Sequence, residues 1–280
     1  MPFGPAVFGL AVLAALSSGA PGRPAGPQAA PPDTVRLEEE LLQALNVERA
    51  SRHLMPVSPV PELLAIARAH SAEMSARDVL SHESAAGKSY QQRLSDAGVI
   101  SVASGENLSR STTSVARLIH QSLMDSPAHR DNMLNPAFDA VGIGVARRDG
   151  ERYFVTMDFI RQFIRKSGDE VRELTLGALT EARTRAGLRP FVATAAANRV
   201  ADELAEAYAA EGAIPPVPLI GQRSTAYFVA GLDLDGLLAA VRELEVRGYG
   251  RGGVGSTFRR SRQYPAGAYA VCIILVWDGS

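Results

Sequence analysis

The chain has 280 residues, of which 46% are hydrophobic, and its formal net charge is −1. That length allows two domains of ordinary size, and the hydrophobic fraction is sufficient for a core in each. The near-zero charge and the lack of interleaved basic and aromatic residues argue against nucleic acid as a partner. Cys272 is the only cysteine, so the chain forms no internal disulfide; because it lies in an apolar run, we expect a buried, unreactive thiol.

The N-terminal residues have the composition of a targeting segment. Residues 6–16 are an apolar run about as long as a signal-peptide core, small residues follow it up to Ala20, and it is too short to span a membrane. The proline- and alanine-rich residues 21–35 predict an extended linker. We therefore expect a signal peptide at residues 1–20 and a secreted or periplasmic protein without a transmembrane span. Residues 1–10 hold no lysine or arginine, so a buried helix is the alternative.

Two helices are predicted next. Leucines at helical spacing, preceded by a run of glutamates, predict a helix that begins near residue 36 and fades near His53. An apolar stripe predicts a second helix over about residues 62–79. His70 lies on that stripe, and we interpret it as a core histidine bonded to a backbone carbonyl. His82 follows the helix in a polar loop, where a turn can present its imidazole to a cleft.

The most informative stretch begins at Ser126-Pro127, which has the pattern of a helix N-cap followed by the first helical residue. Asn135-Pro136 ends that short helix. His129 therefore lies in the first helical turn, where the positive end of the helix dipole favours neutral imidazole. Residues 140–159 contain two β-branched, glycine-containing runs around an Arg-Asp-Gly turn, which predicts a β-hairpin.

Four motifs, in this order, resemble the signature of the CAP superfamily (cysteine-rich secretory proteins, antigen 5 and pathogenesis-related 1) in its bacterial, cysteine-poor form. They are Ala67 to Met74 with Leu80-Ser81-His82, Gly105-Glu106-Asn107-Leu108, the helix Ser114 to Asp125, and the stretch Ser126 to Phe159. The resemblance covers about residues 36–164. It implies an α+β fold, the α-β-α sandwich, in which helices alternate with a small antiparallel sheet.

In the family, two histidines and two acidic residues form a cavity tetrad. The resemblance places His82, Glu106 and His129 at three of these positions. The fourth departs from the family pattern: in the family it comes from the helix before the second histidine, whereas that helix ends here as Gln121-Ser122-Leu123-Met124-Asp125-Ser126. Asp125 and Ser126 are the two candidates for that cleft position, and the sequence does not choose between them.

Two imidazoles and a carboxylate that share one point can hold Zn²⁺ or another divalent ion and leave a coordination position open. His82, His129 and Glu106 are therefore the candidate metal ligands. The same groups can also form a hydrogen-bonded network without a metal. Their spacing matches no short metal motif, so this assignment depends on the resemblance.

Residues 170–278 contain a weak internal repeat. Residues 178–190 match residues 44–56 at a constant offset, and Val254-Gly255 follows the order of Val141-Gly142. The second copy has no histidine and no Gly-Glu-Asn motif. We therefore predict a degenerate second CAP-like α/β domain that has lost the tetrad. The glycine-rich residues 248–253 are a weak candidate for a binding loop.

The resemblance favours an exported protein whose His/Glu cleft binds a ligand, either a lipid or other small hydrophobic molecule or a cell-envelope component, with or without a divalent ion. The enzymatic alternative is a metal-dependent, peptidase-like hydrolase with Glu106 as the general base. A third alternative is a two-domain interaction scaffold with a vestigial cleft. The sequence leaves open whether the protein is an enzyme.

Overall fold

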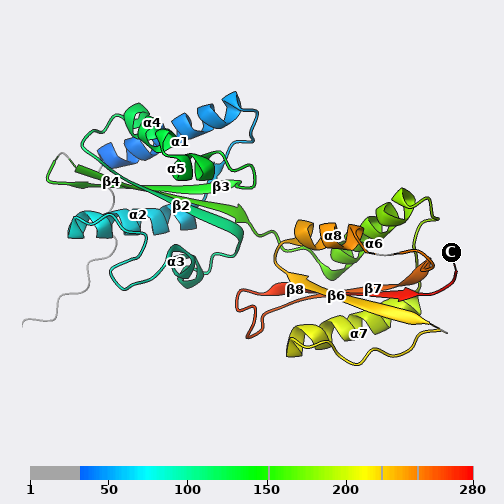
Figure 1. The fold of residues 1–280 in the computed structure, drawn as a ribbon. Coiled ribbons are helices and arrows are strands. Elements are labelled where there is room, and N and C mark those ends of the chain that lie inside the picture. Colours follow the sequence, from blue (N-terminus) through cyan, green and yellow to red (C-terminus); the bar gives the residue numbers. More distant parts are fainter. Residues whose placement is uncertain (1–31, 151, 222, 245, 280) are drawn as a thin grey trace, which may run out of the picture.

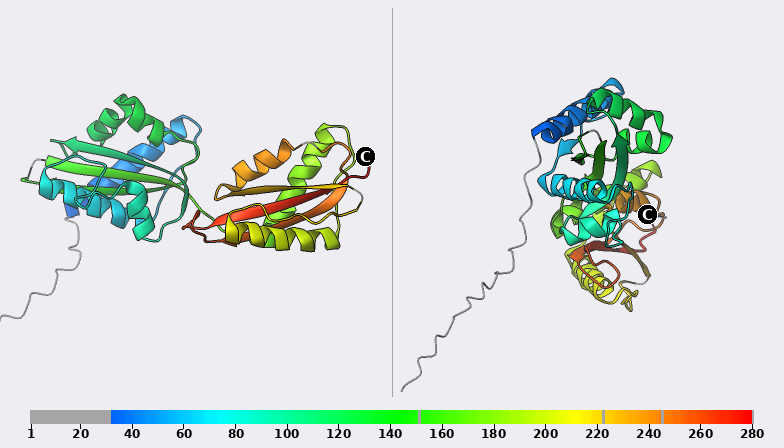
Figure 2. Two further views of the ribbon diagram at one scale, coloured as in Figure 1. Left: turned by 60° about the horizontal axis from the view of Figure 1, so that its bottom comes forward. Right: turned by 90° about the vertical axis from the view of Figure 1, so that its left-hand side faces the viewer.

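The computed structural model describes residues 32–150, 152–221, 223–244 and 246–279, so the expected signal peptide lies outside the described residues. Two α/β units follow one another along the chain (Figure 1). In each unit, helices cover both faces of a four-stranded sheet, and Figure 2 shows the same layers from two further directions. The predicted fold class, an α-β-α sandwich followed by a second domain of similar architecture, is confirmed. In the described part of the chain, none of the helices combines the length and apolar character of a membrane span.

The first unit comprises the elements up to residue 162. These are α1 (Pro32–Ser51), β1 (Ser58–Pro59), α2 (Pro61–Arg77), α3 (Tyr90–Asp96), β2 (Ser101–Ser111), α4 (Ala116–Asp125), α5 (Pro127–Met133), β3 (Ala140–Arg148) and β4 (Arg152–Gln162). The strand order is β1-β3-β4-β2, with β1 parallel to β3 and the other pairs antiparallel. Asp149 and Gly150 have φ of 51° and 80° between β3 and β4, which confirms the predicted hairpin.

The second unit begins after a short connection. Its elements are α6 (Gly168–Arg185), β5 (Val192–Ala193), α7 (Ala195–Glu211), β6 (Ser224–Gly231), α8 (Leu234–Arg242), β7 (Arg251–Arg259) and β8 (Ala268–Val276). The strand order is β5-β7-β8-β6, and β5 is again the short strand parallel to its neighbour. The two sheets therefore have the same order and the same strand directions.

Hydrophobic side chains fill both faces of each sheet. In the first unit the larger core joins the sheet to α1 and α4, and a smaller core joins it to α2 and α3. In the second unit the larger core lies on the side of α6 and α8, and the smaller one on the side of α7. Figure 1 shows these helix layers above and below each sheet.

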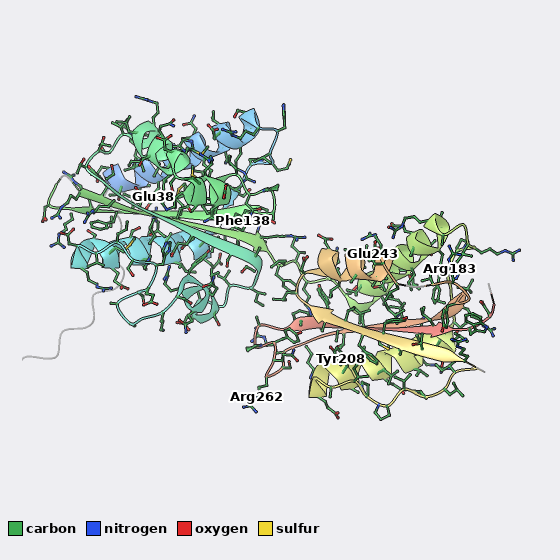
Figure 3. All side chains as sticks on the ribbon, in the orientation of Figure 1. Glu38, Phe138, Arg183, Tyr208, Glu243 and Arg262 are labelled. Carbon is green, nitrogen blue, oxygen red and sulfur yellow. The ribbon has the colours of Figure 1, made fainter. Side chains whose placement is uncertain are left out.

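A buried arginine near the end of the first helix marks equivalent positions in the two units. Arg49 on α1 is fully buried and donates hydrogen bonds to four backbone carbonyl oxygens, those of Met55, Met133, Asn135 and Phe138. Arg183 on α6 is also fully buried and donates to the carbonyl oxygens of Arg189, Val246 and Tyr249. Phe138 and Arg183 are labelled in Figure 3. Each guanidinium thus ties its helix to loops on the same side of its unit.

The short strands β1 and β5 pair with only two residues of β3 and β7, so the rest of that edge of β3 and β7 has no neighbouring strand. In each unit an ion pair covers this open edge. Glu38 on α1 accepts a hydrogen bond from the backbone of β3 and pairs with Arg68 on α2. In the second unit the charges are reversed, because Arg172 on α6 donates to the backbone of β7 and pairs with Asp202 on α7. Both pairs satisfy backbone groups that a neighbouring strand would otherwise bind. The repeat therefore preserves this arrangement but not the charge of each residue.

Close packing of strand against helix corrects the predicted register of the repeat. A Cβ added to Gly144 on β3 would lie 2.2 Å from the carbonyl carbon of Ala67, and one added to Gly255 on β7 would lie 2.1 Å from that of Ala201. Gly255 is therefore equivalent to Gly144 and not to Gly142, so the predicted alignment was wrong by two residues. A shift of two residues keeps every side chain of a strand on the same face, so the sequence pattern hardly distinguishes the two alignments.

We expect Gly144→Ala to destabilise the first unit by about 3 kcal/mol, because the added methyl group meets helix backbone that cannot move aside. Gly177→Ala on α6 is the control, since nothing lies within 4 Å of a Cβ added there. That change is expected to stabilise the second unit by about 0.5–1 kcal/mol. Urea unfolding followed by circular dichroism measures both effects, and a neutral Gly144→Ala variant would contradict the close approach.

Candidate functional site

Six ionisable residues of the first unit make up what we call the polar cluster: His70, His82, Arg93, Glu106, His129 and Asp158. Five of them come from α2, α3, the loop between these helices and the strands that they cover, and His129 comes from α5, which packs in the core on the opposite face of the sheet. Glu106 on β2 lies opposite Asp158 on β4 in the register of the sheet, so both side chains lie on one face. The Glu106 side chain is only 3% exposed. A nearly buried carboxyl group therefore forms the base of the cluster.

His82 is the exposed member of the cluster. Its Nδ1 lies 2.7 Å from Oε1 of Glu106, and its side chain is 64% exposed. A carboxylate that accepts a hydrogen bond from one ring nitrogen fixes the tautomer and the orientation of an imidazole. The arrangement therefore holds the His82 ring at the surface and leaves Nε2 available to a ligand.

Arg93 binds the second carboxylate oxygen of Glu106. Its Nη2 donates to Oε2 of Glu106, and its Nη1 donates to the carbonyl oxygens of His82 and Lys88 at 2.8 and 3.2 Å. The residue comes from α3, which begins at a capping box formed by Ser89 and Gln92. One guanidinium therefore links α3, the loop of His82 and β2. The sequence analysis missed Arg93, since no motif contains it.

His129 lies in the first turn of α5, as predicted, and is half-buried. Asn107 donates a hydrogen bond to the carbonyl oxygen of His129 at 2.8 Å, and Asn132 donates to Asn107 at the same distance. Burial and the nearby charge of His82 lower the pKa of His129, so its imidazole is neutral at pH 7. His129 therefore lies close to His82, while the side-chain hydrogen bonds of Glu106 go to His82 and Arg93.

His70 closes the inner side of the cluster. It is 1% exposed, and its Nε2 lies 2.8 Å from the carbonyl oxygen of Ser81, which confirms the interpretation as a core histidine. Its Nε2 is also 4.0 Å from Oε2 of Glu106. Burial is the main cause that lowers the pKa of His70, so the ring stays neutral in the folded protein.

Asp158 is fully buried beside Glu106. Burial, and then the negative charge of Glu106, raise the pKa of Asp158 well above its usual range. If the Asp158 carboxyl group were ionised, neither of its oxygens would accept a hydrogen bond from any of the described residues. When protonated, the Asp158 carboxyl group can donate a hydrogen bond to Glu106, and it no longer buries a second negative charge beside that residue. The folded protein therefore favours the protonated, neutral form of Asp158.

Asp125 and Ser126, the sequence candidates for the fourth cleft position, have other surroundings. Asp125 is exposed and accepts a hydrogen bond from Gln121 at 2.8 Å. Ser126 precedes α5 as predicted, but its side chain makes no capping hydrogen bond. In the described part of the chain, the acidic neighbour of Glu106 is Asp158. The sequence analysis missed it because only the pairing of β2 with β4 brings the two residues together.

The expected metal ligands His82, Glu106 and His129 do not fit a three-ligand centre in this arrangement. Both oxygens of Glu106 are already bonded, to His82 and to Arg93. Among the described residues, no three His, Cys, Asp or Glu side chains are gathered so that they could hold an ion. Two imidazoles remain, which is one protein ligand fewer than catalytic zinc sites use.

The second unit has apolar residues where the first has the cluster. Glu106 and Asp158 correspond in the sheet register to Ala226 and Ile274, and His70 corresponds to Leu204 on α7. Cys272 lies in this core, and burial raises the pKa of its thiol to about 12, which confirms the expected inert cysteine. The glycine-rich stretch has a packing role, since a Cβ at Gly248 would lie 2.1 Å from the ring of Trp277.

Comparisons with known proteins concern mainly the first unit. The sequence model of the cysteine-rich secretory protein family, CAP, matches residues 42–159. YkwD of Bacillus subtilis, an uncharacterized protein, is 28% identical over 115 residues; the match covers 41% of this chain and 44% of YkwD, which is less than half of that relative.

The crystal structure of an extracellular protein containing an SCP domain from Bacillus anthracis aligns at 28% identity and a TM-score of 0.42, covering 49% of this chain and 45% of that one. The crystal structure of Na-ASP-1 aligns at 10% identity and a TM-score of 0.45, and the alignment covers 86% of this chain and 89% of the Na-ASP-1 chain.

Proposed function

Because this protein belongs through residues 42–159 to the CAP superfamily of cysteine-rich secretory proteins, we propose that it acts outside the cytoplasm as a binding protein for the cell envelope. The polar cluster of the first unit is the proposed binding site. His82 and His129 contact the ligand, Glu106 and Arg93 hold His82 in place, and the second unit supports the first without a site of its own.

The contrast between the two units carries this proposal. Both units have the same sheet order, but Glu106 and Asp158 of the first stand where the second has Ala226 and Ile274. The second unit shows that the fold does not need polar groups at these positions. Burying carboxyl groups costs stability, and such costly groups concentrate at functional sites. The cluster of the first unit therefore has a role other than folding.

Binding fits the cluster better than hydrolysis does. A general base needs an oxygen that can take a proton from an attacking water. Both oxygens of Glu106 are engaged by cationic or N–H donors, and the side chain is almost completely buried. The exposed His82 ring and the neutral His129 ring offer hydrogen-bond donors and acceptors instead. Such groups suit the amides and hydroxyls of peptidoglycan.

The test is co-sedimentation of the protein with insoluble peptidoglycan. The His82→Ala/His129→Ala double variant is expected to bind about 30-fold more weakly, because it loses two hydrogen bonds of about 1 kcal/mol each. His53→Asn is the control: His53 is exposed at a positive φ of 59° that asparagine tolerates, and it lies outside the polar cluster. Equal binding by the double variant and the control, or no sedimentation of any form, would contradict the proposal.

A lipid is the second candidate ligand, because the first unit also has an apolar groove between α1 and α2. The groove has a volume of about 230 Å³, and its lining includes Leu42, Leu64 and Ile143. An acyl chain could lie along such a surface. Flotation with phosphatidylglycerol vesicles forms the second arm of the test, and binding to vesicles without binding to peptidoglycan would identify a lipid ligand.

A further inference from the structure

We propose that Arg93 is the resident cation of the polar cluster and keeps divalent metal ions out of it. The inference deepens the proposed function, on which it rests, because it concerns the same site. It assigns to one residue the exclusion of divalent ions from the carboxylate of Glu106.

Glu106 has only one oxygen that an incoming ion could use. Oε1 is bonded to Nδ1 of His82 at 2.7 Å, an arrangement that orients the imidazole. Oε2 is the remaining ligand atom, and Nη2 of Arg93 occupies it. A guanidinium is charged at every physiological pH and matches a carboxylate geometrically. Arg93 therefore supplies the positive charge that a divalent ion would otherwise bring to Glu106.

Several contacts hold Arg93 in this position. Its side chain is 10% exposed, and its Nη1 donates to the carbonyl oxygens of His82 and Lys88. Its guanidinium also lies over the ring of Tyr90, 5.6 Å from the centroid. An ion could reach Oε2 only if the guanidinium left, which would break these contacts together. If the guanidinium stayed, its charge would repel the ion at short range in a poorly solvated site.

The test is calorimetric titration of the chelator-stripped protein with Zn²⁺ alone. Arg93→Met removes the charge and keeps an unbranched side chain. We expect this variant to bind one Zn²⁺ at least about tenfold more tightly than the wild type, because a positive charge next to the ligand oxygen no longer repels the ion. The gain is expected to disappear in Arg93→Met/Glu106→Gln, because the ligand oxygen then lacks its charge.

Two further variants serve as controls. Arg93→Lys keeps a positive charge at the site and is expected to bind Zn²⁺ as weakly as the wild type. Arg68→Met removes an arginine that pairs with Glu38, outside the polar cluster, and is expected to leave the affinity for Zn²⁺ unchanged. If circular dichroism shows that Arg93→Met does not fold, Arg93→Gln takes its place, since its amide can still donate to the carbonyl oxygens of His82 or Lys88.

Tight one-to-one binding of Zn²⁺ by the wild type would overturn the inference, and so would an Arg93→Met or Arg93→Gln variant that folds but binds no more tightly. These failures are distinct from failure of the proposed function. A wild-type protein that binds both Zn²⁺ and peptidoglycan would disprove exclusion of metal and leave the binding function standing. A wild-type protein that binds neither Zn²⁺ nor peptidoglycan would disprove the binding function and leave the exclusion of metal standing.

Discussion

Replacing Arg49 by methionine is expected to unfold the first unit under conditions in which the second unit stays folded. The buried guanidinium of Arg49 donates to four backbone carbonyl oxygens. Methionine fills much of the same volume but donates no hydrogen bond. Each buried carbonyl group left without a partner costs about 1–3 kcal/mol. A loss of about 4 kcal/mol or more is a large part of the stability of a domain of this size.

The single tryptophan makes the two units separable in one experiment. Trp277 follows β8 and packs edge-on against Tyr249, at 5.2 Å between ring centroids, so its fluorescence reports on the second unit. Far-ultraviolet circular dichroism reports on both. Arg49→Met is expected to lower the thermal transition seen by circular dichroism and to leave the fluorescence transition in place.

Arg183→Met is the matched variant, because Arg183 makes the equivalent hydrogen bonds in the second unit. It is expected to lower the fluorescence transition and to leave the first unit folded. If either variant shifted both transitions by the same amount, the units would unfold as one cooperative body. In that case the equivalence of the two arginines would still hold, but the independence of the units would not.

Local patterns in the sequence predicted several elements of the first unit, but not β1, α3 or β2. The second helix was expected over residues 62–79 and occupies Pro61–Arg77. The hairpin turn lies where the Arg-Asp-Gly sequence predicts it, since residues that tolerate positive φ are required there. His70 was interpreted as a core residue because it lies on an apolar helical stripe, which is a property of the sequence within that helix alone. Each of these predictions depends on residues that are close in sequence.

The candidate site was predicted less completely, because its geometry depends on contacts between distant segments. Family motifs pointed to His82 and Glu106, and the structure brings these two side chains into contact. Arg93 lies outside the motifs, and Asp158 lies within the last of them without any sign in the sequence that it faces Glu106. Packing of α3 brings Arg93 to Glu106, and pairing of β2 with β4 brings Asp158 there. Local sequence patterns do not show which strands pair or where a helix packs, so they could not reveal these two contacts.

Asp158→Asn is expected to stabilise the first unit at neutral pH and to remove part of its pH dependence. The pKa of Asp158 is raised by burial and by the charge of Glu106. In the unfolded chain this group loses its proton near its usual value of 3.8. The folded protein keeps the proton to higher pH, so between the two pKa values the folded state binds more protons than the unfolded state. The free energy of unfolding therefore falls as pH rises through this interval.

The size of the effect follows from the same linkage. Each unit by which the folded pKa exceeds the unfolded one costs the folded state about 1.4 kcal/mol once the pH is above both. Asparagine has the same shape and no charge to bury, so the variant avoids this cost and can still donate to Glu106 through its amide. Wild type and variant are therefore expected to be about equally stable near pH 4 and to diverge as the pH rises.

Urea unfolding at about pH 4, 6 and 8 measures this difference, with circular dichroism for both units and Trp277 fluorescence for the second alone. Asp125→Asn is the control, because Asp125 is exposed and its replacement is expected to change stability by less than about 0.5 kcal/mol at every pH. A variant less stable than the wild type at pH 8 would mean that Asp158 is ionised and compensated by a cation. A stabilised variant whose advantage grows from pH 4 to pH 8 would establish that burial beside Glu106 raises the pKa of Asp158.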